Sequence, residues 1–131
     1  MASEQTRVLL DSSVLINLLR NRLEATRLVR DLIVRGFILA TSSVNIAEVY
    51  AGMRTGEEAA TDELISGLEC LPLTSEIARK AGNIVAIGRR KGRTHSLDDM
   101  MIAATAIESG CALLTDNRRD FEIPEIKLFR V

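Results

Sequence analysis

The amino-acid sequence predicts an α/β fold with a central, mainly parallel sheet. Short, fully apolar runs at residues 8–10, 37–40 and 111–114 are typical of strands that are covered on both faces. Between these runs, apolar residues recur with a period near 3.6, which indicates helices with one buried face. Strands that alternate with helices form βα units, whose crossover connections make successive strands parallel.

The first half of the chain predicts two strand–helix units with additional helices. The expected elements are a strand at 8–10, a helix from Ser12, a helix at 23–35, a strand at 37–40, and helices at 43–51 and 57–67. Ser12 and Ser13 suit a helix start, and the run Thr41-Ser42-Ser43 supplies another N-cap. Gly36 fits the end of the helix at 23–35. In that helix we expect four inward residues: Leu28, Val29, Leu32 and Ile33.

The second half predicts two long helices and three short strands. The expected elements are a strand at 70–73, a helix from Thr74 through Ile87, a basic loop at 88–94, a helix from Leu97 to Gly110, and strands at 111–114 and 126–129. Pro72 cannot donate to a sheet, so the strand at 70–73 is expected to be marginal.

Composition is typical of one globular domain, which we expect over residues 1–131. Hydrophobic residues make up 47% and charged residues 27% of the chain. Aromatic residues make up only 3%, so the core must be aliphatic. The formal net charge of −1 indicates neither a nucleic-acid binder nor an enzyme for acidic substrates, so local clusters must carry any such argument.

The chain termini and cysteines predict a soluble cytoplasmic protein. Residues 1–7 are short and polar and lack the apolar segment of a secretory signal. No apolar run reaches the roughly 20 residues of a membrane span. Cys70 and Cys111 are not spaced as a metal site, and we expect two buried thiols in a reducing compartment.

Several acidic residues lie at the ends of predicted strands or in predicted helices, where the fold can bring them close together. Asp11 and Asp116 come directly after strands, at the sheet edge where α/β proteins bind ligands. Glu48 lies in the helix after the second strand, and Asp98 and Asp99 begin a strongly apolar helix. Gathered carboxylates repel one another unless a cation neutralises them, and Mg²⁺ prefers oxygen ligands. The single histidine, His95, cannot supply a zinc site.

Each acid also has an ordinary structural explanation. Ser96 and Asp99 have the spacing of a capping box, and Asp11 can cap the first helix in the same way. Glu48 can lie on a solvated helix face, although apolar residues flank it on both sides. Asp116 can be a turn residue. The ordered set therefore carries more weight than any single acid.

Four motifs in order resemble those of PIN-domain ribonucleases. They occupy residues 9–16, 45–49, 99–106 and 114–121, and the resemblance covers about residues 7–131. The short chain resembles the VapC-type toxins of toxin–antitoxin pairs. The resemblance implies a three-layer α/β/α sandwich and an endoribonuclease that uses Mg²⁺ or Mn²⁺ to hydrolyse RNA. It also implies a homodimer and a small antitoxin protein whose tail occupies the acidic cleft.

The resemblance assigns roles to particular residues. Asp11, Glu48 and Asp99 match the first three metal-binding and catalytic acids, and Asp98 is an extra acid that we expect to be solvated. Relatives often carry a fourth acid two residues after the threonine, where this chain has Asn117. The fourth group is therefore Asp116 or Asn117, and we include Asp116 in the catalytic and metal-binding set. Supporting roles fall to Ser12, Thr115 and Asn117.

Basic residues flank the proposed cleft in the sequence. The candidates for binding RNA phosphates are Arg89, Arg90, Lys91, Arg93, Arg118 and Arg119. Ordinary solvated charge is the alternative for both runs. For His95, a contact with phosphate is one interpretation, and a surface or helix-entry role is the simpler one. The departure at Asn117 also leaves open a catalytically weak PIN-like module that binds RNA or protein.

Overall fold

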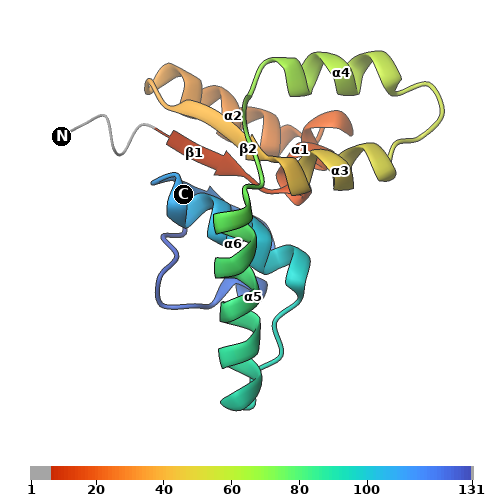
Figure 1. The fold of residues 1–131 in the computed structure, drawn as a ribbon. Helices are drawn as coiled ribbons and strands as arrows, with labels where there is room; N and C mark the ends of the chain where they lie inside the picture. The colour runs from red at the N-terminus through yellow and green to blue at the C-terminus, as the bar shows by residue number, and fades with distance from the viewer. Residues whose placement is uncertain (1–6, 131) are drawn as a thin grey trace.

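A four-stranded parallel sheet forms the centre of the protein, in the order β3-β2-β1-β4 (Figure 1). The computed structural model describes residues 7–130; residues 1–6, on which the expectation of no signal segment depends, lie outside the described residues, as does Val131. The strands are β1 (Arg7–Leu10), β2 (Ile38–Ser42), β3 (Glu69–Leu71) and β4 (Ala112–Leu114). The predicted parallel sheet is thus confirmed.

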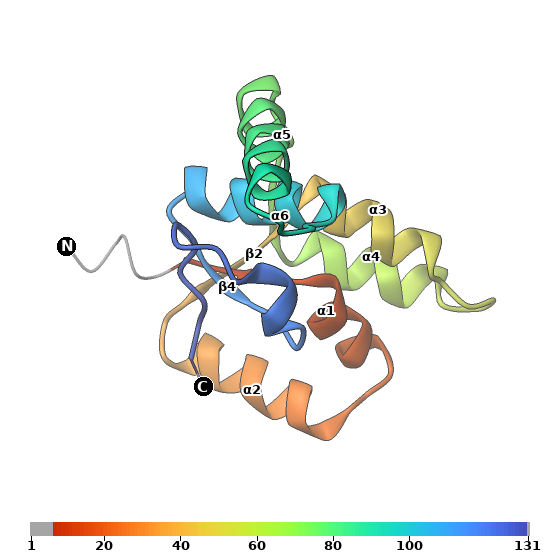
Figure 2. The same ribbon diagram turned by 90° about the horizontal axis from the view of Figure 1, so that it is seen from below.

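Helices cover both faces of this sheet. They are α1 (Ser12–Leu19), α2 (Leu23–Val34), α3 (Ser43–Ala51), α4 (Glu58–Ser66), α5 (Ser75–Arg90) and α6 (Leu97–Glu108), with a 3₁₀ turn, η2, at Arg118–Phe121. Figures 1 and 2 show α1 and α2 on one side of the sheet and α5 and α6 on the other. The three-layer α/β/α arrangement implied by the resemblance is therefore confirmed.

Two aliphatic cores hold the layers together. Side chains alternate along a strand, so β1 contributes to both cores. Leu9 packs with residues of α5 and α6, whereas Val8 and Leu10 pack with residues of α1 and α2. All three are completely buried. Because β1 is covered on both faces, the residue that follows it, Asp11, starts from a rigid position.

The helix α5 extends further than its sequence indicates. Residues 88–94 were expected to form a loop, but α5 continues to Arg90, and Gly92 with φ of 76° follows its end. Gly88 lies within α5, and its lack of a side chain leaves room for the imidazole of His95. A Cβ on Gly88 would lie 2.8 Å from Cδ2 of His95. The glycine therefore serves packing, and the prediction that it opens a loop is wrong.

The strand expected at residues 126–129 is absent from the described part of the chain. Only an isolated bridge joins Leu128 to Leu113 of β4, with Leu113 N–H donating to Lys127 O and Phe129 N–H donating to Leu113 O, both at 2.8 Å. β4 has only three residues, so it offers little edge for another strand to pair with.

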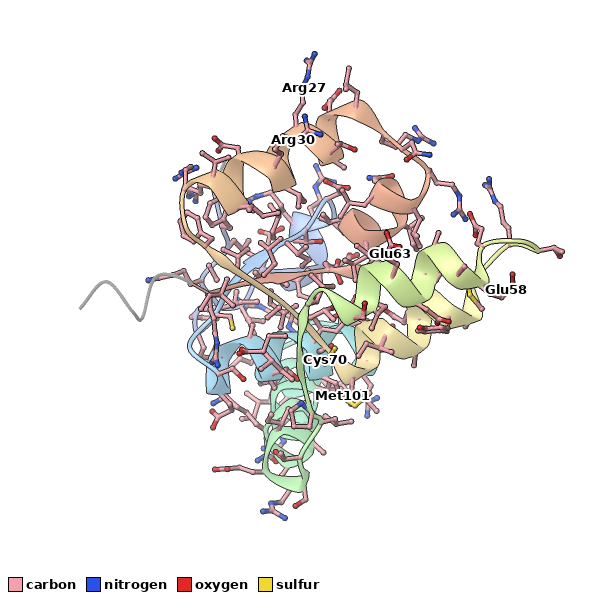
Figure 3. The ribbon with its side chains drawn as sticks, turned by 90° about the horizontal axis from the view of Figure 1, so that it is seen from above. Arg27, Arg30, Glu58, Glu63, Cys70 and Met101 are labelled. Atoms are coloured by element: carbon pink, nitrogen blue, oxygen red, sulfur yellow. The ribbon has the colours of Figure 1, made fainter. Side chains whose placement is uncertain are left out.

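Two side chains that were expected to be buried, those of Ile33 and Cys70, are exposed. Ile33 is 59% exposed, because α2 directs Val29 and Leu32 inward. Cys70 is exposed rather than buried, since it lies on the edge strand β3 next to the inward Leu71. Figure 3 shows Arg27 pointing away from the body of the protein on α2. Among the described residues, none of the helices has the length and apolar character needed to cross a membrane.

Candidate active site

Asp11 lies at the carboxyl end of the central strand and is held by two neutral donors. Its side chain is 4% exposed. Oδ1 accepts a hydrogen bond from Nδ2 of Asn45 at 3.0 Å, and Oδ2 accepts one from Oγ1 of Thr115 at 2.7 Å. Asp11 occupies the N-cap position of α1, yet its side chain makes no capping bond. The capping explanation for this carboxylate is therefore wrong.

Glu48 faces the same region from α3. Oγ of Ser12 donates to its Oε1 at 2.5 Å. Burial, and then the neighbouring carboxylates of Asp98 and Asp11, together raise the pKa of Glu48 from 4.5 to about 7, against the hydrogen bond from Ser12. Glu48 is thus not a solvated helix-face residue, since it senses the charge of both other acids.

Asp98 and Asp99 enter from the first turn of α6. The pKa of Asp99 is raised, first by burial and then by the charges of Asp98, Asp120 and Asp11, against a hydrogen bond from Ser96. The pKa of Asp98 is lowered, mainly because a protonated Glu48 donates to it. Asp98 is exposed, as expected for a solvated residue in the first turn, but its contact with Glu48 is a finding that sequence reasoning missed.

Ser96 occupies the N-cap position of α6 without capping it. Its side chain accepts no hydrogen bond from the helix backbone, so the predicted capping box is absent. The hydroxyl instead favours the ionised forms of Asp98 and Asp99. The positive end of the helix dipole also stabilises these two charges.

Asp116 contacts two residues of α1. Its Oδ2 accepts a hydrogen bond from Nδ2 of Asn17 at 2.8 Å, and its backbone N–H donates to Oγ of Ser13 at 3.2 Å. Asp116 and Asn17 both line a groove beside α2. The preceding residue, Thr115, points to Asp11 instead. The structure thus brings together Asp11, Glu48, Asp98 and Asp99, but directs Asp116 elsewhere.

Asn117 supports the site through its backbone. Its N–H donates to Oγ1 of Thr115 at 2.9 Å, and that hydroxyl donates in turn to Asp11. Asn117 itself is exposed. The supporting residues Ser12 and Thr115 therefore contact acids directly, whereas Asn117 orients one of them.

The donor set fits a hard divalent cation that keeps part of its water shell. Within residues 7–130, no three acid, histidine or cysteine side chains stand close enough to form a ready-made metal site. The charge of Asp11 nevertheless contributes to the raised pKa of both Glu48 and Asp99, so these two carboxyl groups lie within electrostatic reach of Asp11. Mg²⁺ usually binds through one or two carboxylates and several waters, so it suits this spacing.

The basic candidates are distributed unevenly. Arg89 and Arg90 lie in the last turn of α5, which runs away from the sheet and ends far from the end of β1 (Figure 1). The guanidinium of Arg118 donates to the backbone oxygen of Phe129 at 3.1 Å, so it anchors the C-terminal segment. Lys91, Arg93 and Arg119 are exposed.

Comparison with known proteins relates the whole described core to one family. Residues 8–126 match the family described as PIN domain. Ribonuclease VapC10 of Mycobacterium tuberculosis is 38% identical over 113 residues, which cover 84% of this chain and 82% of the relative.

Solved structures give the same result. DNA-bound VapBC from Salmonella typhimurium superposes with a TM-score of 0.81 at 30% identity, over 95% of this chain and 98% of that chain. A toxin–antitoxin complex from Klebsiella pneumoniae superposes with a TM-score of 0.73 at 26% identity, over 95% and 99% of the two chains.

Proposed function

Since the chain belongs to the PIN-domain family of VapC ribonucleases, we propose that it is an endoribonuclease that depends on Mg²⁺ or Mn²⁺. Two observations support this proposal: Asn45 and Ser12 link Asp11 to Glu48 through hydrogen bonds, and the charge of Asp11 contributes to the raised pKa of both Glu48 and Asp99. Neighbouring negative charges repel one another and destabilise the folded state, and carboxylates with perturbed pKa values are commonly found at functional sites.

Each acid has a distinct task in this proposal. Asp11, Glu48 and Asp99 would hold the cation, directly or through water. When bound, the cation activates water and stabilises the negative charge that develops on the phosphodiester. Thr115 and Ser12 keep Asp11 and Glu48 oriented through the hydrogen bonds described above. Asp116 stays in the proposed set only as an outer residue, since its carboxylate is bound to Asn17.

The same family membership supports a biological setting. We propose a toxin that acts in the cytoplasm and is inhibited by a small antitoxin protein, with a homodimer as the assembly. The support is that similar solved structures are named VapBC and toxin–antitoxin complexes. An antitoxin would silence the enzyme most directly by placing a cationic group among the acids.

Cleavage of RNA by the purified protein tests the activity. With Mg²⁺ or Mn²⁺ present we expect cleavage products, and we expect Asp99→Ala to reduce the rate below detection, because removing one ligand of a few weakens the metal site. Glu63→Ala is the matched control, since Glu63 is an exposed acid on α4 (Figure 3). Cleavage that survives both Asp99→Ala and a chelator would overturn the proposal.

A second candidate is a catalytically weak binding module of the same fold. The contact of Asp116 with Asn17 and the amide at Asn117 favour it, because they leave the fourth position of the family pattern without an acid that faces the site. A protein that binds Mn²⁺ and RNA but leaves the RNA intact would support this candidate over the first.

A further inference from the structure

Asn45 joins Asp11 to the segment that carries Glu48. Its side chain is completely buried in the first turn of α3. Nδ2 donates to Oδ1 of Asp11 at 3.0 Å and to Oγ of Ser12 at 2.8 Å. Both protons of the amide are therefore used on groups of the proposed site.

The orientation of this amide is fixed from its other end. Oδ1 of Asn45 accepts from the backbone N–H of Ser42 at 3.3 Å and from Oγ of Ser42 at 2.6 Å. A backbone N–H can only donate and a carboxylate can only accept, so the amide oxygen must face Ser42 and the nitrogen must face Asp11. The capping box that starts α3 thus determines which atom Asn45 presents to the acid.

The amide also determines the direction of the hydrogen bond between Ser12 and Glu48. A hydroxyl group has a single proton to donate. Because Oγ of Ser12 accepts from Asn45, its proton remains available for Oε1 of Glu48. Donors therefore run in one direction, from Asn45 through Ser12 to Glu48, and Oε1 of Glu48 is kept as an acceptor.

We infer that Asn45 is a positioning residue that orients Asp11 directly, and Glu48 through Ser12, for a divalent cation. This inference rests on the proposed function. Asn45 itself touches neither the cation nor RNA. Hydrogen-bonding partners behind metal ligands commonly change metal affinity by about 10–100-fold when they are removed, and Asn45 serves two ligands at once.

Titration of the metal-free, full-length chain with Mn²⁺ tests the inference by calorimetry. We expect Asn45→Ala to weaken Mn²⁺ binding by about 10–100-fold. Asn45→Ser is the second variant in case the alanine variant does not fold, because its side chain is too short to reach Asp11, and we expect the same weakening.

Thr74→Ala is the matched control for loss of a helix cap. Oγ1 of Thr74 accepts from the backbone N–H of Ile77 at 3.1 Å at the start of α5. This variant therefore loses a capping bond like that of the Asn45 variants, but away from the acids. Its Mn²⁺ affinity should equal that of the parent protein.

A double-mutant cycle with Ser12→Ala separates positioning from a general loss of structure. If Asn45 acts through Ser12, the double variant should weaken binding by at least about threefold less than the product of the two single effects. Folded Asn45 variants that bind Mn²⁺ within about twofold of the parent, or single effects that simply multiply, would overturn the inference. A parent protein that binds no Mn²⁺ overturns the proposed metal site and, with it, this inference.

Discussion

At the scale of single residues, the acids of the site differ in how well their charges are compensated. Asp11 receives two neutral hydrogen bonds, whereas Glu48 receives one and faces the carboxylate of Asp98. Burial of Glu48, together with the nearby carboxylate of Asp98, raises the pKa of Glu48 to about 7. Ionised Glu48 therefore opposes folding when no cation is bound, which is the usual conflict between stability and function at a site.

Glu48→Gln should stabilise the metal-free protein at pH 8. The folded-state pKa of about 7 lies above the ordinary 4.5, so the favourable contribution of protonated Glu48 is complete below pH 4.5 and is lost as the pH rises through 7. Glutamine has no charge to lose, and its amide can donate to Asp98. We expect the melting temperature in chelator to rise by about 3–5 °C, or roughly 1 kcal/mol for a domain of this size.

The pH dependence distinguishes this explanation from a generic surface effect. The gain should shrink at pH 5, where Glu48 is already protonated. Glu63→Gln, at an exposed position on α4 (Figure 3), should leave the melting temperature unchanged at both pH values. An equal gain at pH 5 and pH 8 would refute the charge explanation. The Glu48→Gln variant should also lose RNA cleavage, because it loses an anionic ligand.

The sequence predicts which residues form this site better than it predicts how their side chains are oriented and which partners they contact. Asp11 and Thr115 follow strands, and the rule for parallel sheets places both at one edge. The partnership of Asp98 with Glu48 depends on how α6 is rotated against α3, and local sequence does not determine that rotation. Asn45 stands in the motif at 45–49, three residues before Glu48, but its burial gives the signal, and burial is visible only in the fold.

At the scale of elements, the sequence predicted the six helices of the described residues, and its errors concern the end of α5 and the strand expected at residues 126–129. The loop expected at residues 88–94 follows from a basic stretch that contains two glycines, Gly88 and Gly92. The fold instead uses Gly88 for close packing against His95, a contact between residues that the local pattern does not relate. The missing strand at 126–129 has a similar cause, since an apolar run becomes a strand only where an edge is long enough to pair with.

Gly88→Ala should therefore destabilise the protein relative to Gly82→Ala. Both glycines lie in α5, so both substitutions gain the same helix propensity. A Cβ at Gly82 meets nothing within 4 Å, whereas one at Gly88 lies 2.8 Å from Cδ2 of His95 and 3.4 Å from the backbone oxygen of Arg93. We expect the two variants to differ by about 1–3 kcal/mol in urea unfolding.

Removal of the imidazole checks the cause of that difference. In a His95→Ala background, the gap between the two glycine variants should narrow, because the main obstacle to the new methyl group is gone. If the difference in unfolding free energy between the two glycine variants stays the same, the destabilisation comes from the contact with the backbone oxygen of Arg93 instead. Equal stability of Gly88→Ala and Gly82→Ala would show that the imidazole moves aside freely.

At the scale of the whole molecule, the proposed site joins β1, α3 and α6, so a bound cation should stabilise the entire fold. A ligand that binds only the folded state adds about 2.7 kcal/mol at 100 times its dissociation constant. We expect the melting temperature to rise with Mn²⁺ concentration. The rise should disappear in Asp99→Ala and persist in Glu63→Ala, and an identical rise in both variants would place the bound ion elsewhere.

The pairing of β1 with β4 has a consequence for synthesis of the proposed toxin. Thr115 donates to Asp11 across 104 positions of sequence, and Leu10 pairs with Leu114 in the sheet. A ribosome that adds about 5–20 residues per second makes Asp11 several seconds before its partner exists. During that interval the nascent chain lacks the hydrogen bond that orients Asp11, so we expect that copy of the protein not to cleave RNA. Activity begins only when the chain has left the ribosome far enough for its last strand to dock.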